Sequence, residues 1–433
     1  MSIQNDLKAT GLANVIVVLQ QPATAAASVA DFKAISKKAV RALSGSLTDF
    51  FEGEKDIAAI ESAAAASLAK VKAVVGKLKK KTTVRAAGMR VFENLGIVLG
   101  TVDRDGLKKL QQHDNVASVH SAPQLSLIRP VRREAAASLA SAATSVGGFT
   151  WGLDRLGVPA LRAQGLTGKD VLVGHLDTGV DGTHPALQGA IAQFAEFDLN
   201  GDPVPGATAH DSAEHGTHTA GTILGRKQGS VEFGMSPGAS LVSGMVIEGG
   251  KVIDRILAGM DWAVGLKVRI VSMSLGLRGF DDSFLPLTRI LRQRNILPVF
   301  AVGNEGVRTS RSPGNYAEAL SVGFYDENDQ VADLSSSQRF LRAKDPRVPD
   351  LVGPGVNIAS SVPGGGFAVM DGSSMATPHI AGLAALLMEA KPDATADQIE
   401  AAIFASCVLP ATMNVTRANR GIPNGPTALA NLP

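Results

Sequence analysis

Three residues of the types used in nucleophilic catalysis lie far apart along the chain: Asp177, His215 and Ser374. A serine hydroxyl needs a base to take its proton, a histidine does this near neutral pH, and a carboxylate can orient that histidine. Together the three predict acyl transfer to water. Taken singly, each has a plainer interpretation as a turn aspartate, a packed histidine or a helix-capping serine.

Ser374 lies in a stretch, residues 372–379, that begins with a glycine and two serines and leads into the apolar residues 380–387. The small residues predict a tight turn, and the Ala- and Leu-rich run predicts a helix that is buried on nearly all sides. The first turn of such a helix offers free backbone N–H groups and a positive dipole end. This is a suitable place for a developing oxyanion.

Asp177 directly follows an apolar strand candidate and precedes a glycine turn, so neighbouring N–H groups can keep its carboxylate ionised. His215 and His218 are three residues apart and can share one face of a helix. A metal site is the alternative for this pair, but the stretch lacks the glutamate of a helical zinc motif and its other residues are small. We therefore predict His215 to be the general base and His218 to be packed inside.

These residues need a scaffold that brings strand ends together. Apolar strand candidates alternate with helical patterns, which predicts an α/β fold with a mostly parallel sheet covered on both faces. In such sheets ligands gather at the carboxyl ends of the strands. The strand candidates are residues 171–176, 241–247, 270–273, 297–301 and 319–323, and the helical patterns include residues 254–264 and 287–293.

The first 125 residues have a different pattern. Strand candidates at 13–20, 84–92, 96–102 and 116–120, with a helix at 103–112, give the β-α-β-β-α-β order of a ferredoxin-like α+β unit. Its first helical section, residues 28–81, is enlarged into an amphipathic hairpin. Residues 126–150 are a linker by composition, and residues 151–433 form the second domain.

Composition excludes several classes of protein. The formal charge of +2, from 42 basic and 40 acidic residues, gives no reason to expect nucleic acid as a partner. No run of about 18 apolar residues predicts a membrane span. The lone Cys407 cannot form an intramolecular disulfide, which favours a cytoplasmic location. Secretion is the alternative, because residues 8–25 faintly resemble a signal peptide.

With these residues in place, the chain resembles the subtilisin-like serine proteases, the subtilases. The chain order Asp, His, Ser is that of subtilisin. The resemblance extends over about residues 150–400 and rests on six stretches in the family's order. They are residues 151–168, 177–179, 215–218, 272–276, 301–306 and 372–379.

The resemblance implies a three-layer α/β fold and a serine endopeptidase that requires no cofactor. Ser374 would be the nucleophile, His215 the base and Asp177 its partner, while Asn304 and the Ser374 N–H would form the oxyanion hole. The polypeptide substrate would add a strand to the edge formed by Ser274, Leu275 and Gly276, with Gly303 also lining the site. Gly249 and Gly250 are candidates for the opposite wall. No catalytic metal is implied.

Three residues depart from the family pattern: Ser373 replaces the usual threonine, Val302 stands where alanine is common, and His175 lies just before the aspartate motif. Serine keeps the small hydroxyl, so activity should survive, whereas Val302 and His175 put substrate specificity in question more than mechanism. Calcium is common in the family, and Asp198, Asn200 and Asp202 offer oxygens in one polar loop. A plain polar loop is the alternative.

The resemblance also gives the first domain a meaning, that of a propeptide which inhibits its own protease until a cut between residues 127 and 148 releases it. A permanent partner-binding arm is the alternative. Two other functions compete with that of a serine protease. One is a catalytically silent subtilase-like binding protein, which the intact Asp177, His215, Ser374 and Asn304 disfavour. The other is an aspartic protease, which would need a second Asp-Thr-Gly motif.

Overall fold

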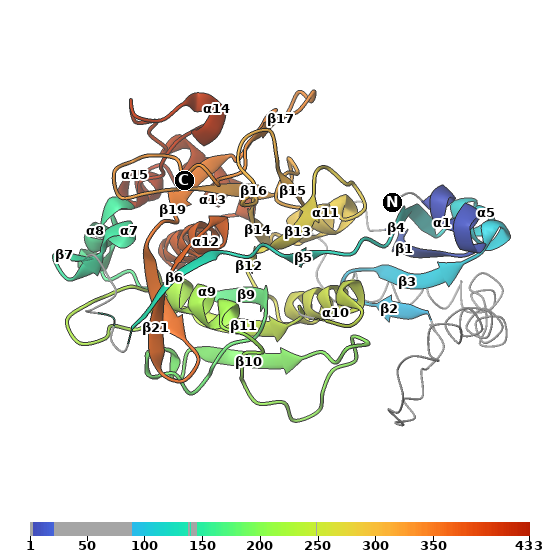
Figure 1. Cartoon of the computed structure of the whole chain (residues 1–433), viewed down its shortest axis with the longest axis horizontal. Coiled ribbons are helices and arrows are strands. Elements are labelled where there is room, and N and C mark those ends of the chain that lie inside the picture. Colours follow the sequence, from blue (N-terminus) through green and yellow to red (C-terminus); the bar gives the residue numbers. More distant parts are fainter. Residues whose placement is uncertain (1–2, 21–88, 137–138, 140–144, 248) are drawn as a thin grey trace, which may run out of the picture. The chain divides into compact units, whose positions relative to one another are not determined.

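A computed structural model of the chain describes residues 3–20, 89–136, 139, 145–247 and 249–433 (Figure 1). The chain forms two compact units, Met1–Pro123 and Gln124–Pro433, each with its own core. The helical hairpin expected at residues 28–81 lies outside the described residues.

The first unit contains a four-stranded antiparallel sheet in the order β2-β3-β1-β4, which is the strand order of the split βαβ arrangement. Apolar side chains of β1 and β3 pack with Leu107 and Leu110 of a helix that links β3 to β4. The helix α1 before the first strand was not expected from the sequence. The elements are α1 (Ile3–Thr10), β1 (Ala13–Leu19), β2 (Arg90–Phe92), β3 (Ile97–Val102), α5 (Arg104–Gln111) and β4 (Val116–Ser121).

The second unit is built on a seven-stranded sheet in the order β10-β11-β9-β12-β14-β16-β19, with every neighbouring pair parallel. The expected mostly parallel α/β sheet is confirmed, and the five strand candidates agree with observed strands to within two residues. Strands β10 and β19, at the two edges, were not expected. The strands are β9 (Leu172–Asp177), β10 (Ile191–Glu196), β11 (Ser240–Met245), β12 (Ile270–Met273), β14 (Leu297–Ala301), β16 (Leu320–Tyr325) and β19 (Leu351–Pro354).

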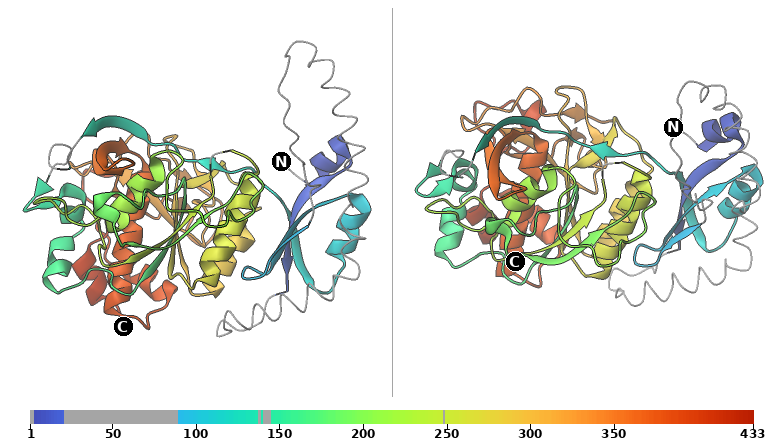
Figure 2. Two further views of the ribbon diagram at one scale, coloured as in Figure 1. Left: turned by 90° about the horizontal axis from the view of Figure 1, so that it is seen from below. Right: turned by 60° about the horizontal axis from the view of Figure 1, so that its bottom comes forward.

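Helices cover both faces of this sheet, as the expected three-layer fold requires (Figure 2). Helices α9 (His215–Leu224) and α12 (Ser373–Ala390) share one core with Val173, Ile270 and Val299 of the strands. Helices α10 (Val252–Gly265) and α11 (Leu285–Gln293) pack on the other face, against β9, β11 and β14.

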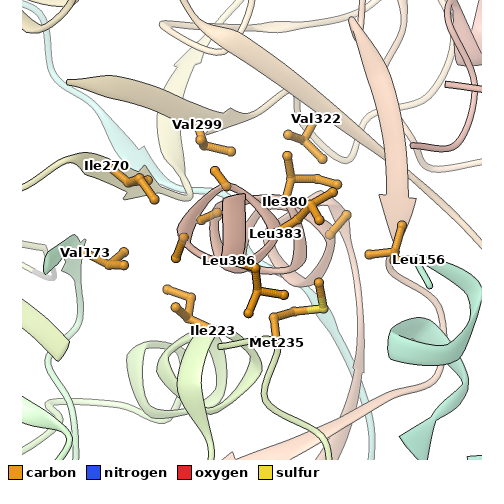
Figure 3. Packing of buried hydrophobic residues seen from close by; sticks show 14 of the residues in the cluster. Leu156, Val173, Ile223, Met235, Ile270, Val299, Val322, Ile380, Leu383 and Leu386 are labelled. Carbon is orange, nitrogen blue, oxygen red and sulfur yellow. The ribbon is translucent and has the colours of Figure 1, made fainter. Parts of the chain in front are cut away.

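Helix α12 runs through the middle of the larger core (Figure 3). Every residue from Ser373 to Met388 is buried, as the Ala- and Leu-rich sequence predicted. The helix begins at Ser373, however, and not after Pro378. Pro378 cannot donate to the carbonyl of Ser374 in the i→i−4 pattern, but packing on all sides keeps the first turn helical. Ser374 is therefore held by the helix itself and not by a preceding turn.

Shorter elements complete the second unit. The helices are α7 (Trp151–Arg155), α8 (Val158–Ala163), η1 (Pro185–Leu187), α13 (Ala396–Ala405), α14 (Val415–Ala418) and α15 (Gly425–Ala430). The strands are β5 (Ser126–Leu127), β6 (Val131–Ala136), β7 (Ser145–Val146), β8 (Phe149–Thr150), β13 (Leu275–Arg278), β15 (Arg311–Ser312), β17 (Gln338–Arg339), β18 (Arg347–Val348), β20 (Ile358–Val362) and β21 (Gly366–Asp371).

Candidate active site

The candidate site lies where the strand order of the large sheet reverses. From β9 the chain builds β10 and β11 on one side, and then crosses to β12 and the later strands on the other. A crevice opens at the carboxyl ends of strands at such a switch point. Asp177 is the last residue of β9, and Ser274 directly follows β12. The topology therefore brings together two stretches that are almost 100 residues apart in sequence.

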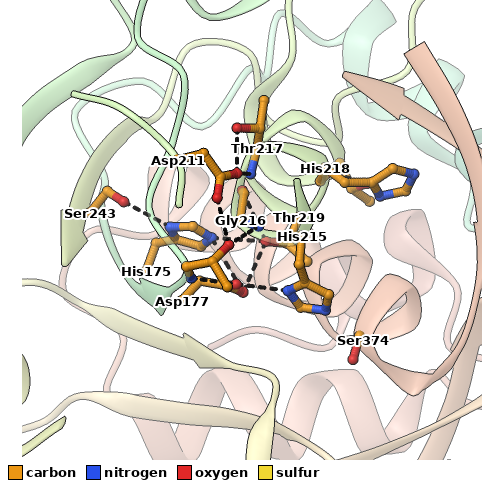
Figure 4. Close-up of polar contacts among 12 residues, drawn as sticks. His175, Asp177, Asp211, His215, Gly216, Thr217, His218, Thr219, Ser243 and Ser374 are labelled. Atoms are coloured by element: carbon orange, nitrogen blue, oxygen red, sulfur yellow. Dashed lines mark hydrogen bonds and ion pairs between the residues drawn. The ribbon is translucent and has the colours of Figure 1, made fainter. Parts of the chain in front are cut away.

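Asp177 and His215 form a buried pair (Figure 4). His215 is the first residue of α9, and its Nδ1 lies 2.7 Å from Asp177 Oδ1. The backbone N–H of Thr178 also donates to Oδ1, at 2.7 Å. An ionised carboxylate oxygen only accepts hydrogen bonds, so His215 Nδ1 carries the proton and Nε2 is left as the basic nitrogen.

Each partner shifts the pKa of the other. Burial alone would raise the pKa of Asp177, but the charge and hydrogen bond of His215 outweigh burial and hold it below its usual range. Burial would likewise lower the pKa of His215, but the charge and hydrogen bond of Asp177 outweigh burial and raise it. Asp177 is therefore an ionised carboxylate, and His215 is a stronger base than an isolated histidine.

Ser374 lies on the side of the His215 ring that faces away from Asp177 (Figure 4). Its Oγ donates a 2.7 Å hydrogen bond to the carbonyl oxygen of Ile128. His215 Nε2 is buried and has no hydrogen-bond partner among the described residues. The Ser374 hydroxyl is thus hydrogen-bonded to another segment of the same chain, while the basic nitrogen of His215 is left without a hydrogen-bond partner among the described residues.

Asn304 follows β14 and lies beside the start of α12. Its Oδ1 accepts from the N–H of Ser373 at 2.9 Å and from the Ser373 hydroxyl at 2.8 Å. These two donors set the orientation of the amide, so Nδ2 points away from them and donates to the carbonyl of Arg129 at 3.0 Å. Ser373 therefore supplies the hydroxyl that orients Asn304.

The segment that engages these residues is an added strand. Leu127 pairs with Leu275 and Ser126 pairs with Gly276 in an antiparallel ladder between β5 and β13. The N–H of Ile128 continues this ladder by donating to the carbonyl of Ser274 at 3.0 Å. The edge predicted from the sequence is therefore occupied by residues 126–128 of the same chain.

Beyond Ser374 the same segment forms β6, which pairs antiparallel with β21. Arg133 Nε and one terminal nitrogen both reach Asp371 Oδ2, at 2.6 and 2.5 Å, and Arg132 Nε reaches Glu214 Oε1 at 2.8 Å. Asp371 also accepts from the N–H of Asn357. Residues 126–136 are thus hydrogen-bonded on both sides of Ser374.

A cavity of about 500 Å³ lies beside this segment. Gly249 and Ile247 line it, together with Asn304 and Leu127. Of the two glycines considered for the wall opposite β13, Gly249 lines this cavity and Gly250 is not among its lining residues.

The other predicted site residues are placed as follows. His218 is fully buried, with Nε2 3.1 Å from the carbonyls of both Ile358 and Ala368, so it is packed inside as expected. In the polar loop, Asp198 Oδ1 already accepts from the N–H groups of Asn200 and Asp202. In the described ranges no group of three His, Cys, Asp or Glu side chains could hold a metal. The loop residues do not gather a ligand set, and calcium there stays a prediction.

Sequence reasoning missed the polar support of the pair. Asp211 accepts from the Thr178 hydroxyl at 2.7 Å and from the N–H and hydroxyl of Thr217 at 2.7 and 2.6 Å. It thereby links the end of β9 to the first turn of α9. The only signal was its position four residues before His215, which by itself indicates a loop aspartate.

Comparison with known proteins decides the family. Residues 168–425 match the profile described as the Subtilase family (Peptidase_S8). Subtilisin amylosacchariticus of Bacillus subtilis subsp. amylosacchariticus is 31% identical over 332 residues, which cover 74% of this chain and 78% of the relative. Subtilisin BL of Lederbergia lenta is 36% identical over 244 residues, which cover 56% of this chain and 85% of the relative. The chain belongs to the subtilase family.

As a subtilase, the chain is a subtilisin-like serine endopeptidase, and its substrate is a polypeptide. The cytoplasmic location expected from the lone Cys407 is wrong. The related subtilisins are secreted, extracellular enzymes, which favours secretion of this subtilase. The physical reason is that a core of this size is stable without disulfides, so cysteine content does not report the compartment. Among the described helices, none has the length and apolar character needed to cross a bilayer.

Proposed function

We propose that Asp177, His215 and Ser374 form the catalytic triad of this endopeptidase, and that Asn304 and the Ser374 N–H bind the oxyanion. The observation that carries the proposal is the buried 2.7 Å contact between Asp177 and His215, with His215 Nε2 open towards Ser374. The set of residue types, their burial and the opposed pKa shifts all support it.

The protease is made as a zymogen that carries its own inhibitor. Residues 126–128 lie on the β13 edge as a substrate strand would, and the Ile128 carbonyl accepts from the Ser374 hydroxyl. The bond between Ile128 and Arg129 is therefore the one to be cut. In the precursor Ser374 donates to this carbonyl, and the Asn304 amide is engaged one residue further on, at Arg129. Reaction requires the Ser374 hydroxyl to turn its proton from this carbonyl to His215 Nε2, and the Asn304 amide to turn from Arg129 to the Ile128 carbonyl.

The reaction is acyl transfer. Ser374 Oγ forms a bond to the Ile128 carbonyl carbon while its proton passes to His215 Nε2. The bond to Arg129 then breaks as His215 returns that proton to the new amino group. Water, activated in the same way, hydrolyses the ester and frees Ser374. Asp177 stabilises the imidazolium of His215 that forms both when the ester is made and when water hydrolyses it.

Labelling with phenylmethylsulfonyl fluoride tests the triad. We expect one label per chain on Ser374 at neutral pH, together with loss of peptidase activity, and no label in Asp177→Ala or Ser374→Ala. Label with normal turnover, or label on another serine, would contradict the assignment. A catalytically silent binding protein would show neither label nor turnover, and inhibition by pepstatin would indicate an aspartic protease.

The length of the purified chain tests whether the protease is made as a zymogen that cuts itself. Wild-type protein should lose about its first third on purification, and the new amino terminus should be Arg129. The Ser374→Ala protein should remain at full length. Equal lengths for both proteins would argue against self-processing and for a first domain that remains as a partner-binding arm.

A further inference from the structure

We propose that His175 is a positioning residue of the active site, which acts through Thr219 to hold the carboxylate of Asp177. This inference rests on the proposed triad. His175 and Asp177 are two residues apart on β9, so their side chains leave the same face of the sheet. The strand is otherwise apolar, and a histidine in its middle has to be accounted for.

Both ring nitrogens of His175 have a partner although the ring is only 1% exposed. Nδ1 lies 3.0 Å from Ser243 Oγ on β11, and Nε2 lies 2.8 Å from Thr219 Oγ1 on α9 (Figure 4). Buried polar groups are costly unless they are hydrogen-bonded, and here each one is. The ring thus connects the sheet to the helix that starts with His215.

The surroundings of Thr219 fix the direction of these bonds. Its Oγ1 lies 3.2 Å from Asp177 Oδ2 and 3.1 Å from the carbonyl of Gly216, and both of these atoms only accept. The single hydroxyl proton must go to one or both of these acceptors. The Thr219 oxygen therefore accepts the proton on His175 Nε2, and the Ser243 hydroxyl donates to Nδ1.

The result is a directed chain of donors, from Ser243 through His175 and Thr219 to Asp177. It meets the carboxylate at Oδ2, whereas His215 and the Thr178 N–H meet it at Oδ1. Donors on both oxygens prevent the carboxylate from rotating. His175 does not bond to Asp177 directly, because its Nε2 lies 3.7 Å from Oδ2.

His175 can keep this role only while it is neutral. Burial lowers its pKa despite the attraction of Asp177 and Asp211, and the proximity of His215 lowers it further. These three groups are the charged neighbours that face the ring from β9, the loop before α9 and α9 itself. Burial thus keeps the ring in the neutral form that the donor chain requires.

Four variants test the proposal: His175→Leu, His175→Gln, Thr219→Val and the double variant His175→Leu with Thr219→Val. Leucine removes the donor, whereas the glutamine amide can still donate to Thr219. Turnover is measured on a peptide substrate and divided by the number of sites that phenylmethylsulfonyl fluoride labels. This normalisation removes any loss that comes from unfolded protein.

We expect kcat per labelled site to fall about tenfold or more in His175→Leu and Thr219→Val, because each breaks a hydrogen-bond chain that ends on a charged group. KM should stay within about twofold, since neither residue reaches the substrate edge. His175→Gln should retain most of the activity. The double variant should be no worse than Thr219→Val alone, because both act through one chain.

Three results would overturn the proposal. One is an unchanged kcat per labelled site with only a lower melting temperature, which would mean that His175 merely supports the core. Another is a glutamine variant as slow as the leucine variant, and the third is additive losses in the double variant. Asp177→Ala is measured in parallel. If it retains full activity the triad assignment fails, whereas if it is inactive and His175→Leu is normal, only the role of His175 fails.

Discussion

Ser373 and Asn304 show how two neighbouring polar side chains prepare one donor. The amide of Asn304 has no freedom to flip, since its oxygen already accepts twice from Ser373. A donor fixed before reaction costs no reorganisation in the transition state, which is why such groups stabilise an oxyanion strongly. The serine at position 373 keeps the hydroxyl that a threonine would supply.

Asn304→Leu removes this donor with little change in size. We expect the rate of self-processing to fall by about 10²–10³-fold, the range known for the corresponding donor in subtilisin itself. The measurement is the time course of the shortened chain on a gel. Asn328→Leu, in an exposed turn, is the control and should process at the wild-type rate. A change of less than about tenfold in Asn304→Leu would remove Asn304 from the oxyanion hole.

At the scale of residues, the sequence was sufficient to select Asp177, His215 and Ser374, the members of the proposed triad, because each lies in a short motif at an element end. It could not identify Asp211, Thr219 or Ser243 as their support. A threonine within a helix and a serine within a strand carry no local signal. Their roles arise only when β9, β11 and α9 meet.

At the scale of elements, α12 is so closely packed that its one glycine is required. A Cβ on Gly382 would lie 2.3 Å from the Cβ of Met235 and 3.2 Å from the carbonyl of Ile223. Both atoms are at or next to the backbone, so they cannot move without shifting the chain around them. Glycine at position 382 therefore lets the backbone of α9 and the residue Met235 approach α12 closely.

Gly382→Ala therefore sets helix propensity against packing. Alanine should gain about 1 kcal/mol of helix propensity, whereas overpacking a core costs about 1–3 kcal/mol and a contact this close lies at the upper end. We expect a net loss in the free energy of unfolding, measured by urea denaturation in the Ser374→Ala protein to prevent self-digestion. A more stable variant would mean that the core around Met235 yields easily.

The segment at residues 126–136 is a second element whose strength can be tested. Arg133 makes its ion pair with a carboxylate that is only 8% exposed, whereas the partner of Arg132 is 36% exposed. Exposed pairs contribute little, and a buried carboxylate that loses its partner is costly.

In the Ser374→Ala protein, Arg133→Gln should therefore make β6 detach more often, so that an added protease cuts the segment several times faster. Arg132→Gln is the matched control and should have a smaller effect. The rates are followed by mass spectrometry of the fragments. If Arg132→Gln had the larger effect, the Asp371 pair would not be what holds this strand.

Element boundaries were predictable where the pattern is periodic, as in β12 and α11. The sequence did not reveal that α12 includes Ser374, because proline normally marks a helix start and the packing that overrides it is tertiary. Nor did it predict that a segment which appears to be a linker by composition pairs with β13 and β21. Such pairing depends on edges made by residues about 150 and 240 positions later.

At the scale of the whole molecule, two buried histidines make stability depend on pH. Burial lowers the pKa of His218 to about 3 and that of His379 to about 4. In the unfolded chain both would titrate near 6.5. At these two sites the folded protein thus binds fewer protons below pH 6.5, so their contribution to stability should fall as the pH drops from about 6.5 towards 4, whereas Asp350, whose pKa burial raises to about 7, contributes in the opposite direction.

Each such histidine contributes a slope of about 1.4 kcal/mol per pH unit within that window. We expect His379→Gln in the Ser374→Ala protein to reduce the slope of unfolding free energy against pH by about that amount near pH 5. The exposed His210→Gln is the control. An unchanged slope in His379→Gln would mean that His379 takes up its proton without unfolding.

The hold of β5 on β13 and of β6 on β21 has a kinetic consequence. A cut at the Ile128–Arg129 bond, between β5 and β6, would leave two chain ends that are each still hydrogen-bonded to the protease. The first product would therefore remain in the cleft and compete with incoming substrate. Activity should therefore appear only after a lag, and the lag should shorten once a few molecules are free to digest the retained ends of the others.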